Sequence, residues 1–177
     1  MDRTPSGVIK INVDVALSKN VSMASAATIA RDEDGRFMGA SALVLRGIVD
    51  PEVMESIACR EGMALVADLQ ADSFRLANDC LNVVKSIRQG DLGMNRQVIR
   101  EINARKAAFS SVEFAHEHRD SNTDAHRIAR SSIHAKVAWH VWFLNPPDGV
   151  CNMYNPIWIK RVVLLKNQPV RLVVFGL

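Results

Sequence analysis

The N-terminal part of the chain alternates between hydrophobic and polar residues with the period of two that is typical of β-strands. In Gly7–Leu17 the apolar positions on one side are Ile9, Ile11, Val13 and Val15, and the polar positions on the other are Lys10, Asn12 and Asp14. Two further runs, Ala26–Arg31 and Phe37–Leu45, read as strands joined by a turn that contains Gly35. We therefore expect an antiparallel meander of three strands.

Helical patterns separated by short strands follow the meander. The pair Asp50-Pro51 is a favourable helix start, and the helical period continues to about Leu69. Strands are predicted over Ser73–Asn78 and Val112–His116, and helices over Asp79–Arg88, Arg96–Phe109 and Asn122–Leu144, the last carrying Trp139 and Trp142. This order predicts an α/β fold with a five-stranded mixed sheet, three antiparallel strands and then parallel strands, flanked by helices.

Chain length and composition favour one globular domain over residues 1–143, followed by a tail over residues 144–177. The 177 residues are 48% hydrophobic and 23% charged, which is ordinary for a globular protein with a real core. The tail is a basic and apolar segment with two strand-like runs around "KNQP". It could form a hairpin, bind a membrane surface or a partner, or pack on nothing.

Cysteine usage and hydropathy indicate the compartment. The three cysteines (Cys59, Cys80 and Cys151) are odd in number and scattered, which argues against a disulfide framework and against a zinc ribbon. The N-terminus has no apolar core of a secretion signal, and no apolar run approaches the length of a membrane span. We expect an intracellular protein, nuclear or cytoplasmic, that is a monomer and does not insert into a membrane.

The net charge of +3 is concentrated in the tail. Residues 144–177 hold four Lys and Arg side chains against one Asp, so the first 143 residues are neutral. A protein that coats a duplex normally shows a basic stripe. Any nucleic-acid contact of the domain must therefore depend on local geometry rather than on bulk charge.

Three carboxylates are candidates for chemistry, and each has a structural alternative. Asp14 is on the polar side of the first strand, where it could simply be solvated. Asp79 follows a strand and precedes a helix, where Asp is a favoured N-cap. Glu55 lies in the first turn of its helix, where a negative charge suits the dipole, but it also heads a stripe that should face inward.

Topology brings the three carboxylates together. With a right-handed crossover, the first and fourth strands are neighbours, and the intervening helix packs across them. Clustered carboxylates repel one another unless a cation neutralises them, and an all-oxygen ligand set selects Mg²⁺ or Mn²⁺. Asp14, Glu55 and Asp79 therefore predict a two-metal site for phosphoryl transfer.

The stretch "EFAHEHRDSNTDAHRIAR" holds His116, His118 and His126, three of the five histidines of the chain. Three histidines among acids raise the possibility of a transition-metal site. The alternatives are a catalytic segment of a larger site and a polar loop that leads into a helix.

Five motifs of the chain occur in the order found in the type 1 ribonuclease H domain. They are "KINVDVALS", "IARDEDGRFMGA", "ESIACREGMALVADL", "LANDCLNVV" and "FAHEHRDSNTDAHRIARSS", spread over residues 8–143. Each is weak alone, but their combination is specific. The chain most resembles the plant retroelement-related, reverse transcriptase-like branch of that family.

The resemblance implies a metal-dependent endoribonuclease that hydrolyses the RNA strand of an RNA–DNA hybrid with two Mg²⁺ ions, for which Mn²⁺ can substitute. Asp14, Glu55 and Asp79 fall at the first three acidic positions of its site. His126 falls at the fourth metal-binding position, where the wider family uses Asp, and His116 matches a mobile histidine that assists proton transfer and product release. The resemblance therefore disfavours zinc binding by the three histidines. His118 is expected to be solvated, and Asn122 is expected to cap the last helix.

The chain departs from the pattern of the family at four places. Ala77 and Asn78 replace a small-polar or acidic pair before Asp79, a change that is expected to matter less than the others. Val15 replaces a glycine that lets the backbone approach the RNA strand, so it could obstruct the substrate. His126, when neutral, removes a negative charge from the metal site. The insertion with a basic substrate-binding helix is absent. The nearest replacements for its phosphate contacts are Arg88, Arg96, Arg100, Arg105 and Lys106, which could equally form a solvated helix face.

Two other functions fit the same sequence. A ribonuclease H-fold nucleic-acid-binding domain with weakened catalysis is favoured by Val15 and by the neutral charge of residues 1–143. A protein-interaction module would use the surface near Trp139, Trp142 and the tail.

Overall fold

The chain folds around one six-stranded mixed sheet in the order β5-β4-β1-β2-β3-β6. This computed structural model describes residues 7–90, 93, 95–143 and 145–150. Its strands are β1 (Ile9–Ser18), β2 (Met23–Arg31), β3 (Phe37–Arg46), β4 (Ser73–Asn78), β5 (Ser111–His116) and β6 (Trp139–Trp142). Its helices are α1 (Pro51–Asp68), α2 (Leu81–Gln89), α3 (Arg96–Arg105) and α4 (Thr123–Ser132), with short 3₁₀ turns at Lys106–Ala108 and Arg119–Ser121.

The predicted meander of β1, β2 and β3 is confirmed. β1 pairs with β2 and β2 pairs with β3, both antiparallel. Gly35 in the second turn has φ +80°, a backbone conformation that costs glycine little because it has no Cβ atom. The strand β2 is buried along nearly its whole length, which places the meander at the centre of the molecule.

The parallel half of the sheet grows from the other edge of β1. β4 pairs with β1 and β5 pairs with β4, both parallel, and each connection crosses over through helices. Helix α1 begins as predicted, with the side chain of Asp50 accepting the backbone N–H of Val53 and with Pro51 in the first turn.

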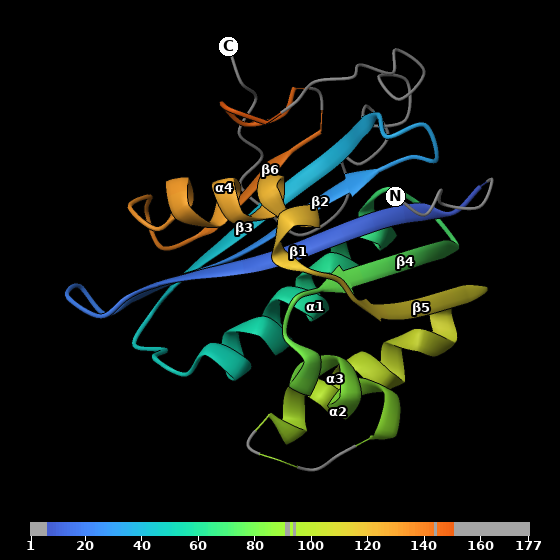
Figure 1. Cartoon of the computed structure of the whole chain (residues 1–177), viewed down its shortest axis with the longest axis horizontal. Helices are drawn as coiled ribbons and strands as arrows, with labels where there is room; N and C mark the ends of the chain where they lie inside the picture. Colours follow the sequence, from blue (N-terminus) through green and yellow to red (C-terminus); the bar gives the residue numbers. More distant parts are fainter. Residues whose placement is uncertain (1–6, 91–92, 94, 144, 151–177) are drawn as a thin grey trace.

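Helices cover the two faces of the sheet unequally (Figure 1). α1, α2 and α3 pack on one face around a large apolar core that includes Ile11, Val13 and Leu76. α4 packs on the opposite face, where Ile128 and Ala129 meet the small side chains of β2 and β3. β1 is therefore covered on both faces, which decides the environment of Asp14.

The prediction of a helix over Asn122–Leu144 is wrong beyond Ser132. α4 ends there, and Trp139–Trp142 forms β6, which pairs antiparallel with Ala40–Leu43 of β3. The two tryptophans are three residues apart, which suits a helix, but pairing with the open edge of β3 satisfies the backbone groups of both strands. The sheet consequently has six strands instead of the five predicted.

The predicted tail lies almost entirely outside the described residues, which end at Val150. Val150 itself is buried against α4 and the strands beneath it. Across the described part of the chain, the helices are all too short or too polar to cross a bilayer.

Candidate active site

Asp14 and Asp79 meet at the point where the parallel pairing of β1 and β4 ends. The last pair of that ladder is Asn12 with Ala77, and each aspartate lies two residues further along its strand direction. Parallel strands keep paired positions side by side, so the carboxylates of Asp14 and Asp79 lie next to each other at the same end of the β1–β4 pairing.

Glu55 comes to the same place from α1. The helix starts at Pro51 and runs across β1 and β4. Glu55, its fifth residue, lies just beyond the first turn in which it was predicted and is only 7% exposed. Gly62 allows the close approach of the helix, since a Cβ atom there would lie 2.9 Å from Cδ1 of Leu76 and 3.1 Å from Cγ2 of Ile11. The inward direction expected for Glu55 is confirmed.

The three carboxylates form one cluster. One oxygen from each of Asp14, Glu55 and Asp79 lies within 4.8 Å of the others. The alternative interpretation of Asp14 as a solvated strand residue is wrong, because the packing of α4 leaves it 3% exposed. The alternative interpretation of Asp79 as an N-cap is wrong too, because α2 starts later, with Cys80 at its N-cap position.

The cluster raises the pKa of Asp14 above its ordinary value. Burial is the largest cause, and the negative charge of Asp79 adds to it. The backbone N–H of Val15 and the ring of His126 act in the opposite direction but do not cancel these effects. A buried carboxylate beside two others is the environment that a bound cation would relieve.

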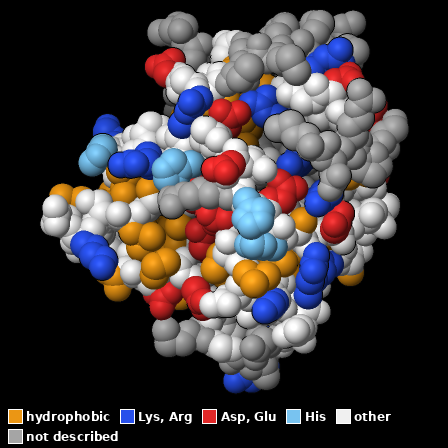
Figure 2. Space-filling view, in the orientation of Figure 1, with side chains coloured by type: hydrophobic (Ala, Val, Ile, Leu, Met, Phe, Trp, Pro, Cys, Tyr) orange, Lys and Arg blue, Asp and Glu red, His pale blue; other side chains and the backbone are white. Residues whose placement is uncertain are grey.

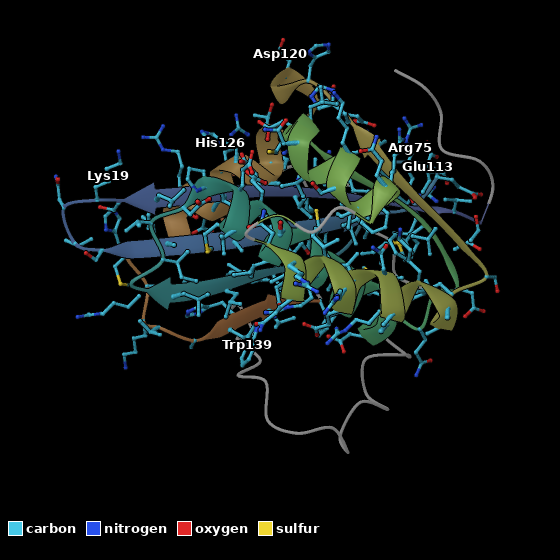
Figure 3. The ribbon with its side chains drawn as sticks, turned by 90° about the horizontal axis from the view of Figure 1, so that it is seen from below. Lys19, Arg75, Glu113, Asp120, His126 and Trp139 are labelled. Atoms are coloured by element: carbon cyan, nitrogen blue, oxygen red, sulfur yellow. The ribbon has the colours of Figure 1, made fainter. Side chains whose placement is uncertain are left out.

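Two of the three histidines border the cluster. Nδ1 of His126, on α4, lies 2.7 Å from Oδ2 of Asp14, and Nε2 of His116 lies 3.1 Å from the backbone oxygen of Asp79. His118 is exposed, with its ring centroid 5.8 Å from that of His116. Figure 3 shows His126 above the sheet beside β1. His126 thus faces a carboxylate instead of the other two histidines, which disfavours a three-histidine zinc site.

Asn78, a departure from the family pattern that was expected to matter less, is a site residue. Its Nδ2 atom donates to Oε2 of Glu55 at 3.0 Å and to the Sγ atom of Cys59 at 3.3 Å, and its Oδ1 atom accepts the backbone N–H of Cys80 at 2.6 Å. The side chain is buried and ties α1 to the end of β4. The signal was present in "LAND", where a polar side chain closes a buried strand directly before Asp79.

Asn122 is at the N-cap position of α4, but its side chain does not cap the helix, so that prediction is wrong in its chemistry. Its Nδ2 atom donates instead to the backbone oxygen of Val13, beside Asp14. The Asn122 side chain therefore fastens the start of α4 to β1 and helps to hold His126 over the cluster.

The profile of the reverse transcriptase-like family matches residues 12–132, which is more than half of the chain and includes the three carboxylates, His116, His126, Asn78 and Asn122. The chain belongs to this family. No curated protein shows a significant match to it in sequence.

Solved structures place this family member among ribonuclease H folds. Ribonuclease H1 of the archaeon Halobacterium salinarum NRC-1 is 18% identical, covers 70% of this chain and 98% of its own, and superposes with a TM-score of 0.59. The N-terminal ribonuclease H domain of Rv2228c from Mycobacterium tuberculosis is 18% identical over 72% of this chain and 94% of its own, with a TM-score of 0.65. LC11-RNase H1 in complex with an RNA/DNA hybrid is 19% identical over 71% and 96%, with a TM-score of 0.61. At these identities the likeness shows the fold.

Val15 is where this family member departs most clearly from the expected pattern. Its side chain is half-buried and packs against the core on the α1 side of the sheet, next to the cluster. Its backbone N–H donates to Oδ1 of Asp14 at 2.7 Å. The volume that a glycine would leave open beside the carboxylates is therefore filled.

Most of the basic residues named for phosphate contacts are already bound to the protein. Arg88 donates to the backbone oxygen of Phe114, Arg105 pairs with Glu101, and Lys106 donates to the backbone oxygen of Ile87. Burial also lowers the pKa of Lys106 below its usual value. Arg96 and Arg100 are exposed, and no ion pair or hydrogen bond joins either side chain to another described residue.

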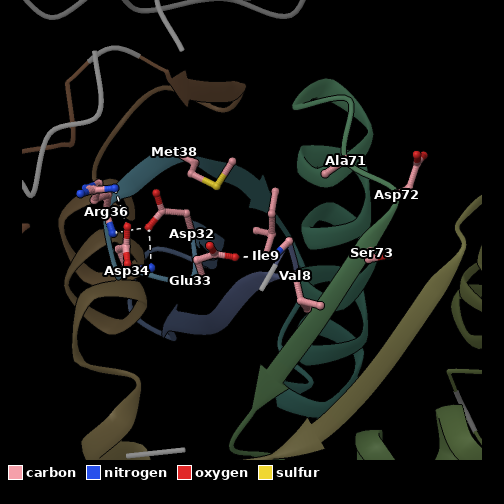
Figure 4. A pocket seen from close by; sticks show the side chains of 11 residues that line it. Val8, Ile9, Asp32, Glu33, Asp34, Arg36, Met38, Ala71, Asp72 and Ser73 are labelled. Carbon is pink, nitrogen blue, oxygen red and sulfur yellow. Dashed lines mark hydrogen bonds and ion pairs between the residues drawn. The ribbon is translucent and has the colours of Figure 1, made fainter. Parts of the chain in front are cut away.

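A second acidic region lies at the opposite end of the sheet (Figure 4). A hollow of about 490 Å³ is lined there by Asp32, Asp34, Asp72 and the start of β1. Asp32 accepts the backbone N–H groups of Asp34 and Arg36, and Arg36 pairs with Asp34. Asp32 and Asp34 therefore stabilise the turn between β2 and β3. The cluster of Asp14, Glu55 and Asp79 remains the better candidate for metal binding.

Proposed function

We propose that the protein is a metal-dependent endoribonuclease that hydrolyses the RNA strand of RNA–DNA hybrids. The observation that carries the proposal is the convergence of Asp14, Glu55 and Asp79 within 4.8 Å, in a chain of the reverse transcriptase-like family. Two solved ribonuclease H1 structures of the same fold support it, one of them described as a complex with an RNA/DNA hybrid.

The donor set fits hard divalent cations. The three carboxylates offer only oxygen atoms, which Mg²⁺ and Mn²⁺ prefer, and the pKa of Asp14 is raised by its burial and, in addition, by the negative charge of Asp79. Asp14, Glu55, Asp79 and His126 would hold two Mg²⁺ ions, with Mn²⁺ able to substitute. When bound, the ions would activate a water molecule and stabilise the leaving oxygen of the phosphodiester.

The residues of the chain have separate tasks in this proposal. Asn78 orients Glu55 through its 3.0 Å hydrogen bond, and Asn122 fixes the start of α4 on β1. His126 holds the Oδ2 atom of Asp14 in place, and His116, exposed at the mouth of the site, is positioned to move a proton or to assist product release. The hybrid would be recognised by its minor-groove shape and 2′-hydroxyl groups.

The substrate class is tested by comparing three end-labelled duplexes of one sequence: an RNA–DNA hybrid, an RNA duplex and a DNA duplex. The proposal expects internal cuts in the RNA strand of the hybrid and at least tenfold slower cleavage of both other duplexes. Equal cleavage of the RNA duplex, or cleavage of the DNA strand, would contradict the proposed specificity.

A second candidate function is a nucleic-acid-binding domain with weakened catalysis, and Val15 favours it. If Val15 obstructs the approach of the RNA strand, the wild type binds the hybrid without cutting it, and Val15→Gly restores cleavage. The substitution also removes packing against the core and is expected to lower stability by about 1 kcal/mol or more. A gain of activity in this less stable variant would identify obstruction as the cause.

A further inference from the structure

Three segments that meet on one side of the molecule contain no carboxylates. Residues 16–30, 37–49 and 125–140 hold five Lys and Arg side chains and three histidines, but no Asp or Glu. The domain as a whole is close to neutral, so this distribution is a local concentration of positive charge. Figure 2 shows Lys, Arg and His side chains gathered over α4.

These segments are joined by packing as well as by charge. α4 lies across β1, β2 and β3, and Ile133, just after the helix, packs with Met23 of β2 and Val44 of β3. Figure 3 shows Lys19 at the end of the β1–β2 hairpin, further along the sheet than His126. The positive charge therefore extends from the edge of the carboxylate cluster along α4 toward the hairpin.

The exposed side of α4 carries the part of this charge nearest to the cluster. Arg127 and Arg130 are three residues apart and His126 and Arg130 four apart, spacings that place side chains next to one another on a helix. Four residues of helix advance by about 6 Å, so Arg130 lies one turn beyond the histidine that contacts Asp14. We refer to Arg127, Arg130, His134 and Lys136 as the α4 basic surface.

The arginines of the α4 basic surface are open to solvent. The side chain of Arg127 is 57% exposed, with one contact to the backbone oxygen of Gly149 at 2.9 Å and a longer one, 3.8 Å, to Asp124. Asp124 itself pairs with Arg31 at 2.6 Å. Arg130 is exposed, and no ion pair joins it to another side chain in the described ranges.

We propose that the α4 basic surface binds the phosphodiester backbone of the nucleic acid as it leaves the carboxylate cluster. The inference rests on the proposed function and adds the path of the substrate. The cluster repels phosphates until cations are bound, so an adjacent cationic surface is needed to hold the backbone. α2 and α3 offer a rival set of exposed basic residues in Lys85, Arg96 and Arg100, but α3 also carries the carboxylate of Glu101, whereas the segments around α4 contain no Asp or Glu.

The test measures the affinity of the whole chain for a fluorescent RNA–DNA hybrid by anisotropy, with metal chelated so that no cleavage occurs. Arg130→Glu is compared with Arg100→Glu, which reverses the charge of an exposed arginine on α3. We expect Arg130→Glu to weaken binding at least tenfold and Arg100→Glu less than twofold. In the double variant Arg127→Gln/Arg130→Gln, the plot of log association constant against log salt concentration should become less steep. Its slope should be smaller in magnitude by roughly 1.8, about 0.9 for each lost phosphate contact.

Affinity within twofold of the wild type for Arg130→Glu, with an unchanged salt slope, would overturn the inference even if the protein cuts hybrids. A larger loss of affinity in Arg100→Glu would place the phosphodiester backbone on α3 and would also overturn the inference. A wild type that binds no hybrid would overturn it as well. Cleavage is scored separately, so the failure of the proposed function is recognised by a different readout. Circular dichroism melting confirms that each variant is folded.

Discussion

His126 on α4 and Asp14 on β1 are 112 positions apart in the chain, yet Nδ1 of the histidine lies 2.7 Å from Oδ2 of the aspartate. This contact ties α4 to β1 at the carboxylate cluster. It also leaves Asp14 with two hydrogen-bond partners, the ring of His126 and the backbone N–H of Val15, in a buried place beside Asp79.

The raised pKa of Asp14 predicts that the metal-free protein is less stable at neutral than at acid pH on account of this residue. A carboxyl with a raised pKa in the folded state stabilises the fold below its unfolded value of about 3.9, and loses that contribution as the pH rises through the folded pKa. Asp14→Asn should therefore gain stability relative to the wild type as the pH increases from 4 to 7. Urea unfolding in chelator measures the difference.

The exposed Asp148 provides the matched control for this titration. Asp148→Asn should change the free energy of unfolding by less than about 0.5 kcal/mol at every pH. If Asp14→Asn were less stable than the wild type by the same amount at pH 4 and at pH 7, the stabilising effect of neutralising Asp14 would be refuted.

Divalent cations should reverse the effect of the clustered charges. Because a ligand that binds only the folded state stabilises it, Mn²⁺ at a hundred times its Kd should add about 2.7 kcal/mol to the free energy of unfolding. Asp79→Asn should lose most of this gain, and Asp148→Asn should keep it. Thermal melting with increasing Mn²⁺ checks the prediction, and an equal rise of Tm in all three proteins would show that the ion binds elsewhere.

Asn78→Ala should weaken both the fold and the metal site. The substitution removes the hydrogen bonds that Asn78 makes to Glu55 and to the backbone N–H of Cys80, at a cost of about 1–3 kcal/mol for buried groups. Loss of a residue that orients a metal ligand typically lowers metal affinity by about 10- to 100-fold.

The control for Asn78→Ala is Asn82→Ala, which removes an exposed asparagine whose Nδ2 atom contacts Glu52. Urea unfolding and Mn²⁺ titration should leave the control near the wild type. Unchanged Mn²⁺ affinity in Asn78→Ala would mean that Asn78 only supports the fold and does not position Glu55.

Gly62→Ala should destabilise the protein although alanine is the better helix former. The added Cβ atom meets Cδ1 of Leu76 at 2.9 Å and Cγ2 of Ile11 at 3.1 Å, so either these buried side chains or α1 must shift. Overpacking of this kind costs about 1–3 kcal/mol, against a gain in helix propensity of about 1 kcal/mol. Gly93→Ala meets no atom within 4 Å and serves as the control in urea unfolding. A Gly62→Ala variant at least as stable as the wild type would contradict this account of the helix approach.

The sequence predicted local elements well where their own residues determine them. β4 is found at Ser73–Asn78, as predicted, because the apolar alternation is bounded by turns, and α1 starts at Pro51 because Asp50 caps it. β6 was mistaken for helix because its identity depends on the open edge of β3, about a hundred residues away. Pairing between distant segments leaves little trace in the spacing of Trp139 and Trp142.

The site was predictable only in part, for the same reason. The sequence shows the three carboxylates and the positions of Asp14 and Asp79 near the end of the β1–β4 pairing. The burial of Asp14, by contrast, depends on α4 packing over β1. The role of Asn78 depends on α1 bringing Glu55 to within hydrogen-bonding distance. Side chains that support a site through tertiary contacts are visible only once the elements are assembled.

The most direct test of the central claim is the rate of RNA-strand cleavage in an end-labelled RNA–DNA hybrid, measured with Mg²⁺ present and with Mg²⁺ chelated. We predict cleavage by the wild type that stops on chelation, returns when Mg²⁺ or Mn²⁺ is restored, and falls at least a hundredfold in Asp79→Asn. Cleavage that persists in chelator, or that survives unchanged in folded Asp79→Asn protein, would contradict this claim.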